Sequence, residues 1–121
     1  MEPRPAYHLE ERTIQFTMNV ARFANGLVLN TSNHEYAKQL VRSAGSVGAN
    51  YIEANESLSK KDCAMRLRIS RKEAKETQYW LRIIVETNSL PSIVESGKIL
   101  LNEAIELRNI LSSIITKIGP T

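Results

Sequence analysis

Cysteine, histidine and aromatic residues are scarce in this chain of 121 residues. The single cysteine, Cys63, excludes an internal disulfide framework and is typical of a protein from a reducing compartment. The two histidines, His8 and His34, have no cysteine or second histidine at the spacing of metal ligands. The sequence therefore predicts no disulfide-dependent fold, no metal site and no cofactor.

Long apolar runs and catalytic motifs are also lacking. No stretch approaches the roughly 18 apolar residues of a membrane span, and residues 1–5 lack the apolar run of a signal peptide. We therefore expect no membrane partner and a cytoplasmic location. The chain has no glycine-rich loop and no Glu-x-x-His motif of the kind found in di-iron bundles. Because Cys63 falls at an expected core position, we expect an inert buried thiol and no enzymatic activity.

The chain does have apolar residues at alternating spacings of three and four, the pattern of a helix with one buried face. Four segments show this pattern, at about residues 9–29, 33–58, 60–88 and 91–118. Ser32 and Ser59 each precede an acidic residue at capping-box spacing, and Gly119 ends the last segment. The expected fold is all-α, with residues 1–121 forming one up-down-up-down four-helix bundle.

Residues 43–50, Ser-Ala-Gly-Ser-Val-Gly-Ala-Asn, are unusual for the interior of a helix. Each interior glycine costs about 1 kcal/mol relative to alanine. Gly45 and Gly48 share a second stripe with Ile52, beside the core stripe that ends at Leu58. Two alternatives are open. Either the glycines admit a helix of the same chain at close range, or this face meets another subunit.

Large apolar residues also lie off the core stripe of the third segment, at Ile69, Trp80 and Ile83. A bundle helix needs one apolar seam, so the surplus predicts a protein interface. The alternative is that Trp80 covers the edge of the bundle. The predicted oligomer interface comprises Gly45, Gly48, Ile52, Ile69, Trp80 and Ile83.

Positive charge is concentrated in the third segment. Residues 60–82 hold eight of the sixteen basic residues and three acids, a net charge of +5 against +3 for the whole chain. A basic stripe that contains a tyrosine is typical of a surface that binds a polyanion. The predicted nucleic-acid-binding residues are Arg68, Arg71, Lys72, Lys75, Tyr79 and Arg82. The alternatives are an ordinary solvated helix face and a site for an acidic protein.

Two stretches resemble a known family. They are residues 39–54, which contain Gln-Leu-Val-Arg-Ser-Ala-Gly-Ser-Val-Gly-Ala-Asn and then Ile-Glu-Ala, and residues 72–81, which contain Lys-Glu-Ala and Tyr-Trp-Leu. The sequence is similar to the bacterial four-helix-bundle proteins encoded in intervening sequences of 23S rRNA genes, sometimes labelled ribosomal proteins. The resemblance implies a ring-like homopentamer. A more distant relative, the accessory protein of diversity-generating retroelements, serves a reverse transcriptase and binds nucleic acid.

These observations predict a non-enzymatic, oligomeric bundle that binds nucleic acid. RNA is the preferred candidate, and DNA is the second. The basic face of the third helix would make the contact. The alternative is an adaptor or accessory subunit, for example for a reverse transcriptase, which binds a protein and has no direct role with nucleic acid.

Overall fold

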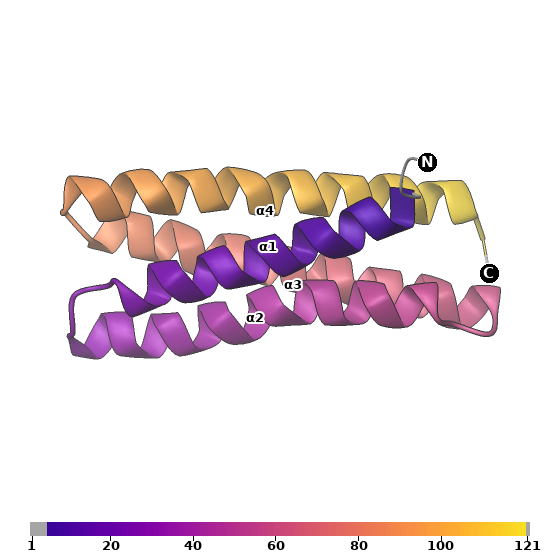
Figure 1. Cartoon of the computed structure of the whole chain (residues 1–121), viewed down its shortest axis with the longest axis horizontal. Helices are drawn as coiled ribbons and strands as arrows, with labels where there is room; N and C mark the ends of the chain where they lie inside the picture. Colours follow the sequence, from indigo (N-terminus) through magenta and orange to yellow (C-terminus); the bar gives the residue numbers. More distant parts are fainter. Residues whose placement is uncertain (1–4, 121) are drawn as a thin grey trace.

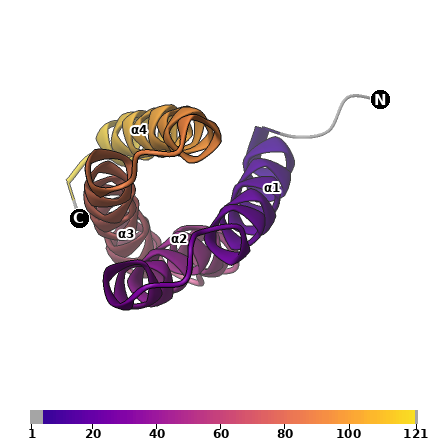
Figure 2. The same ribbon diagram turned by 90° about the vertical axis from the view of Figure 1, so that its left-hand side faces the viewer.

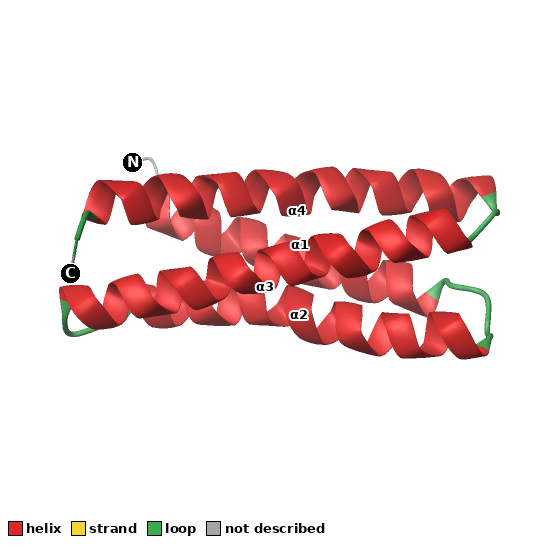
Figure 3. Cartoon of the chain, turned by 180° about the vertical axis from the view of Figure 1, so that it is seen from behind, coloured by secondary structure: helices red, strands yellow, loops and turns green. Residues whose placement is uncertain are grey.

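The computed structural model describes residues 5–120, so residues 1–4 of the segment tested for a signal peptide lie outside the described residues. Four helices make up this part of the chain, and it contains no strand (Figure 3). They are α1 (Pro5–Asn25), α2 (Thr31–Asn55), α3 (Lys60–Thr87) and α4 (Pro91–Ile118). The helices alternate in direction, so α1 begins and α4 ends at the same end of the bundle (Figure 1). The predicted all-α, up-down-up-down fold is confirmed.

Helices that follow one another in the sequence make the main contacts, and α1 and α4 also touch, over a smaller area. Seen end-on, the four helices follow an open arc with α1 and α4 at its two ends (Figure 2). Across this opening the Arg12 guanidinium binds Glu103 through two hydrogen bonds of 2.8 and 2.7 Å and Glu106 through one of 2.6 Å. A polar bridge therefore joins the ends of the arc.

The helix ends were predicted with mixed success. The Ser59 hydroxyl accepts a hydrogen bond from the Asp62 amide at 3.1 Å, and Gly119 ends α4 at φ 77°, as expected. The predicted start of α2 was wrong, because the N-cap residue is Asn30 and not Ser32. The Asn30 side-chain oxygen accepts from the Asn33 amide at 2.8 Å, and asparagine is among the strongest N-cap residues. Helix α1 also ends four residues earlier than predicted, just before Gly26.

The apolar stripes of the four helices form one core. Its largest fully buried apolar side chains are Phe16, Val20, Leu40, Val47, Leu67, Leu81, Ile84, Leu107 and Leu111. One predicted core position was wrong, and several others lie at the edge of the core. Leu58 is 100% exposed, because α2 ends at Asn55 and Leu58 lies in the connection to α3. Cys63 is only half-buried, because it lies in the first turn of α3 at the edge of the core.

Hydroxyl groups join α2 and α3 inside the core. The Ser70 hydroxyl donates to the Val47 carbonyl at 2.6 Å, and the Thr77 hydroxyl lies 2.9 Å from that of Ser43. Small polar side chains let the two helices approach closely, and their hydrogen bonds avoid the cost of unpaired buried groups. Helix α3 is therefore held firmly against α2, and its outer face is presented on a rigid support.

Candidate nucleic-acid interface on α3

The predicted basic stripe is exposed along its whole length. Arg68, Lys72, Lys75 and Arg82 are all exposed, and Tyr79, which stands among them, is 58% exposed. None of these four cations forms a salt bridge with a residue of the described chain. We call these five residues the basic ridge. Arg71, the sixth predicted residue, is half-buried beside it.

Two of the acids of α3, Glu73 and Glu76, pair with a residue of α2 and not with the basic ridge. Arg42 of α2 lies 3.2 Å from the Glu73 carboxylate and also binds Glu76. Burial raises the pKa of Glu76, but hydrogen bonds from Trp80 and Arg42 outweigh it and leave the pKa below its ordinary value, with a smaller contribution from the charge of Lys72. Arg42 offsets part of the negative charge of these two acids, and none of the four cations of the basic ridge forms a salt bridge with them.

The N-terminal half of the basic ridge lines a shallow hollow of about 490 Å³. Arg68, Lys72 and Ile69 lie together there, with Lys61 and Asp62 at its end. Ile69 was predicted to belong to an oligomer interface, and the structure brings it into the same hollow as two basic residues. An apolar surface between cations suits an anionic partner that also carries apolar groups.

The C-terminal half of the basic ridge borders a larger groove of about 640 Å³ between α3 and α4, which we call the α3–α4 groove. Lys75, Tyr79 and Arg82 come from α3, together with Ile83, another residue predicted at an oligomer interface. Helix α4 adds three residues that sequence reasoning missed, Leu101, Ile105 and Arg108. No local pattern could have found them, because only the packing of α4 on α3 brings them beside the basic ridge.

Three aromatic rings form a row beside this groove. The Trp80 ring lies 5.9 Å from that of Tyr36 on α2 and meets the Tyr79 ring edge-on at 4.9 Å. The indole nitrogen of Trp80 donates to Glu76 at 3.1 Å. Trp80 is therefore partly buried against the edge of the bundle core, and its place in an oligomer interface stays a prediction. The row also holds Tyr79 in place at the groove.

The two glycines of α2 have different surroundings. Gly48 is buried, and a Cβ atom there would lie 2.7 Å from the Thr13 hydroxyl of α1. Gly48 thus admits a helix of the same chain, which is the intramolecular alternative. Nothing lies within 4 Å of a Cβ atom added at Gly45. The intramolecular alternative therefore does not account for Gly45.

Gly45 and Ile52 lie on an apolar face shared by α1 and α2. They line a hollow of about 280 Å³ with Ile14 and Met18 of α1. Ile14 is 43% exposed, and Met18 and Ile52 are each 37% exposed. We call these four residues the α1–α2 face. Its position is separate from the basic ridge, so the predicted interface residues occupy more than one surface.

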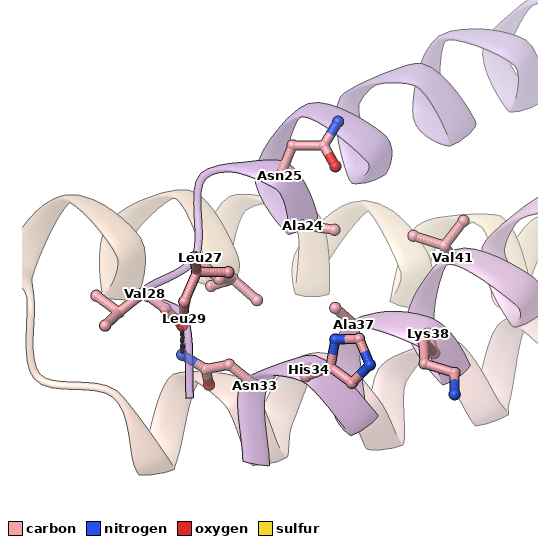
Figure 4. A pocket seen from close by; sticks show the side chains of 10 residues that line it. All are labelled: Ala24, Asn25, Leu27, Val28, Leu29, Asn33, His34, Ala37, Lys38 and Val41. Atoms are coloured by element: carbon pink, nitrogen blue, oxygen red, sulfur yellow. Dashed lines mark hydrogen bonds between the residues drawn. The ribbon is translucent and has the colours of Figure 1, made fainter. Parts of the chain in front are cut away.

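The turn between α1 and α2 borders a further open hollow of about 510 Å³, which Figure 4 shows with its lining side chains. Leu27, Val28 and Val41 give it apolar walls. The Asn33 side chain donates to the Val28 carbonyl at 2.9 Å, drawn dashed in Figure 4, and exchanges two 3.0 Å hydrogen bonds with the Asn88 side chain. This hollow therefore lies beside a turn that is tied to the end of α3.

The described residues contain neither a cluster of metal ligands nor a membrane-spanning helix. Within residues 5–120, no three side chains among His, Cys, Asp and Glu gather as a metal site would require. None of the described helices is both long and apolar enough to cross a membrane.

Comparison with known proteins identifies the family. Residues 8–113 match the family model described as 23S rRNA-intervening sequence protein. The fold is similar to a crystal structure from Bacteroides thetaiotaomicron, described as a protein with unknown function from the S23 ribosomal protein family. The two share 30% sequence identity over 92% of this chain and 97% of the other, with a TM-score of 0.81. No curated protein matches the chain. The resemblance seen in residues 39–54 and 72–81 is therefore confirmed, and the chain belongs to the 23S rRNA-intervening sequence protein family.

Proposed function

We propose that this protein is a non-enzymatic, self-associating helical bundle that binds nucleic acid, RNA first, through the basic ridge of α3. The observation that carries the proposal is the row of exposed cations without salt bridges among the described residues, on a helix whose acids Glu73 and Glu76 pair with Arg42. Such a surface attracts the phosphates of a polyanion and releases their counterions on binding.

Several features support contact with the backbone of a nucleic acid more than with particular bases. The basic ridge offers four cations and one aromatic ring, and it has none of the amide side chains that read base edges in pairs. Affinity should therefore vary little with sequence and fall steeply with salt. RNA is the first candidate because the family is named for sequence within ribosomal RNA.

Self-association belongs to the same proposal. The α1–α2 face leaves apolar side chains exposed, and the family resemblance implies five subunits in a ring. In such an assembly the basic ridge would occur once per subunit, so that positive charge accumulates over a larger surface. That repetition would strengthen the attraction of a long polyanion beyond that of a single helix.

The test is a fluorescence-anisotropy titration of labelled RNA and DNA at two salt concentrations. The triple variant R68E/K72E/K75E should lose binding while it keeps its helical fold, because these side chains lie outside the core. For a single strand, these three phosphate contacts should account for about 2 in the wild-type slope of log K against log salt. The variant K38E/K98E/K117E, with the same change of charge at exposed sites outside the basic ridge, is the matched control.

A second candidate function would take the place of the first if the wild-type protein binds neither RNA nor DNA at low salt. The protein would then be an adaptor or accessory subunit that docks a protein partner. The apolar side chains Ile69 and Ile83, which lie in the hollows along α3, favour that alternative. An apolar interface would depend little on salt, and this separates the two candidates.

A further inference from the structure

We propose that the α3–α4 groove receives an unstacked base of a single-stranded nucleic acid, while the neighbouring phosphates lie on its rim. The inference rests on the proposed function and adds a substrate class to it, single strands in preference to duplex.

The groove combines two kinds of surface. Ile83, Leu101 and Ile105 supply apolar surface, and Ile105 is still 37% exposed. Lys75 and Arg82 stand on the α3 side and Arg108 on the α4 side, against one acid, Glu86. The excess of cations favours an anionic occupant, and the apolar surface favours one that is also flat or apolar. A nucleotide with its base unstacked has both properties.

Tyr79 favours a nucleic acid over an acidic protein segment as the occupant. Its ring borders the groove, is 58% exposed and is flanked by the cations Lys75 and Arg82. Aromatic rings between cations are the platforms on which proteins stack the bases of single strands. Because the ring packs edge-on against Trp80 at 4.9 Å, it is already positioned before any base arrives.

A duplex cannot use this groove in the same way. Its bases are stacked and paired, so it presents mainly phosphates to a convex helical surface. A single strand can turn a base outward and gain both stacking and phosphate contacts. Cations on both helices allow the strand to pass across the groove with a phosphate on either side of the inserted base.

The experiment compares a labelled single-stranded RNA of about 20 nucleotides, longer than one site, with the same strand annealed to its complement. Y79A should weaken binding of the single strand roughly 5- to 150-fold, the range for loss of one base stack, and leave duplex binding unchanged. Y79F keeps the ring and should bind as wild type. Circular dichroism confirms that each variant is folded.

A second pair of variants tests the groove without touching the aromatic row. I105E places a carboxylate in the groove, whereas I99E adds the same charge on α4 at a residue that is 63% exposed and lies outside the groove. I105E should weaken binding of the single strand strongly, and I99E only by the general effect of added charge. Equal effects of the two variants would contradict the inference.

The remaining outcomes separate the two proposals. If wild type binds nucleic acid but Y79A changes neither affinity, or both equally, the groove inference falls and the proposed function stands. If wild type binds no nucleic acid at low salt, the proposed function falls and the inference falls with it. If Y79A or I105E changes the mass of the assembly, a second copy of the chain covers the groove, and the inference is wrong.

Discussion

At the scale of single residues, the glycines of α2 show how strongly the effect of a side chain depends on its neighbours. We expect G48A to destabilise the fold by about 1–3 kcal/mol, the usual range for overpacking. The added Cβ would lie 2.7 Å from the Thr13 hydroxyl and 2.9 Å from the Thr13 Cβ, which belongs to a stiff, branched side chain. Urea unfolding, followed by circular dichroism, measures the change.

G45A is the matched control for this prediction. It makes the same chemical change three residues away, where nothing lies within 4 Å of the new atom. Replacing a helical glycine that has no close neighbour within its own chain with alanine should stabilise the helix by up to about 1 kcal/mol. If G48A is as stable as wild type, α1 does not approach α2 at Thr13 as closely as described.

At the scale of helices, the contact between α2 and α3 should depend on pH through Glu76. The folded-state pKa of this carboxyl is lowered, so its contribution is complete above the unfolded value, about 4.3, and is lost as the pH falls through the lower folded value. We expect E76Q to be less stable than wild type near neutral pH and equally stable in acid. Thermal melts at a series of pH values measure this convergence.

E86Q is the control for the pH series. Glu86 is an exposed carboxyl on the same helix and forms no salt bridge with a described residue. The stability of the E86Q variant should change with pH as that of wild type does. An E76Q profile that coincides with wild type at neutral pH as well as in acid would show that the link between Arg42 and Glu76 contributes nothing to the fold.

At the scale of the whole molecule, we expect the protein to be a homo-oligomer with a mass that is a multiple of 13.7 kDa, and five subunits by family resemblance. I52E places a charge on the α1–α2 face and should lower the mass measured by multi-angle light scattering, because a buried unpaired charge opposes association. I99E, the same change outside that face, should not. A wild-type mass of one chain at micromolar concentration would contradict this prediction.

Much of the fold and part of the candidate site could be predicted because they depend on local geometry. Spacings of three and four bring residues to one side of any α-helix, so the basic ridge and most core positions followed from the order of residues alone. The prediction that Leu58 belongs to the core was wrong, because periodicity does not show where a helix ends. The cap of α2 was wrong because Asn30 and Ser32 are both suitable N-cap residues and lie two positions apart.

The sequence by itself determined the four helices, their apolar stripes and the row of cations on α3, since each is a property of one segment and its helical period. Only the tertiary structure decided which residues of other helices lie beside these features. The packing of α4 on α3 brings Arg108 and Ile105 to Tyr79, and the path of α1 over α2 buries Gly48 but leaves Gly45 open. The physical reason is that these contacts depend on which side of a helix its neighbour packs against. That choice is made by the packing of residues far apart in the chain, which no local pattern contains.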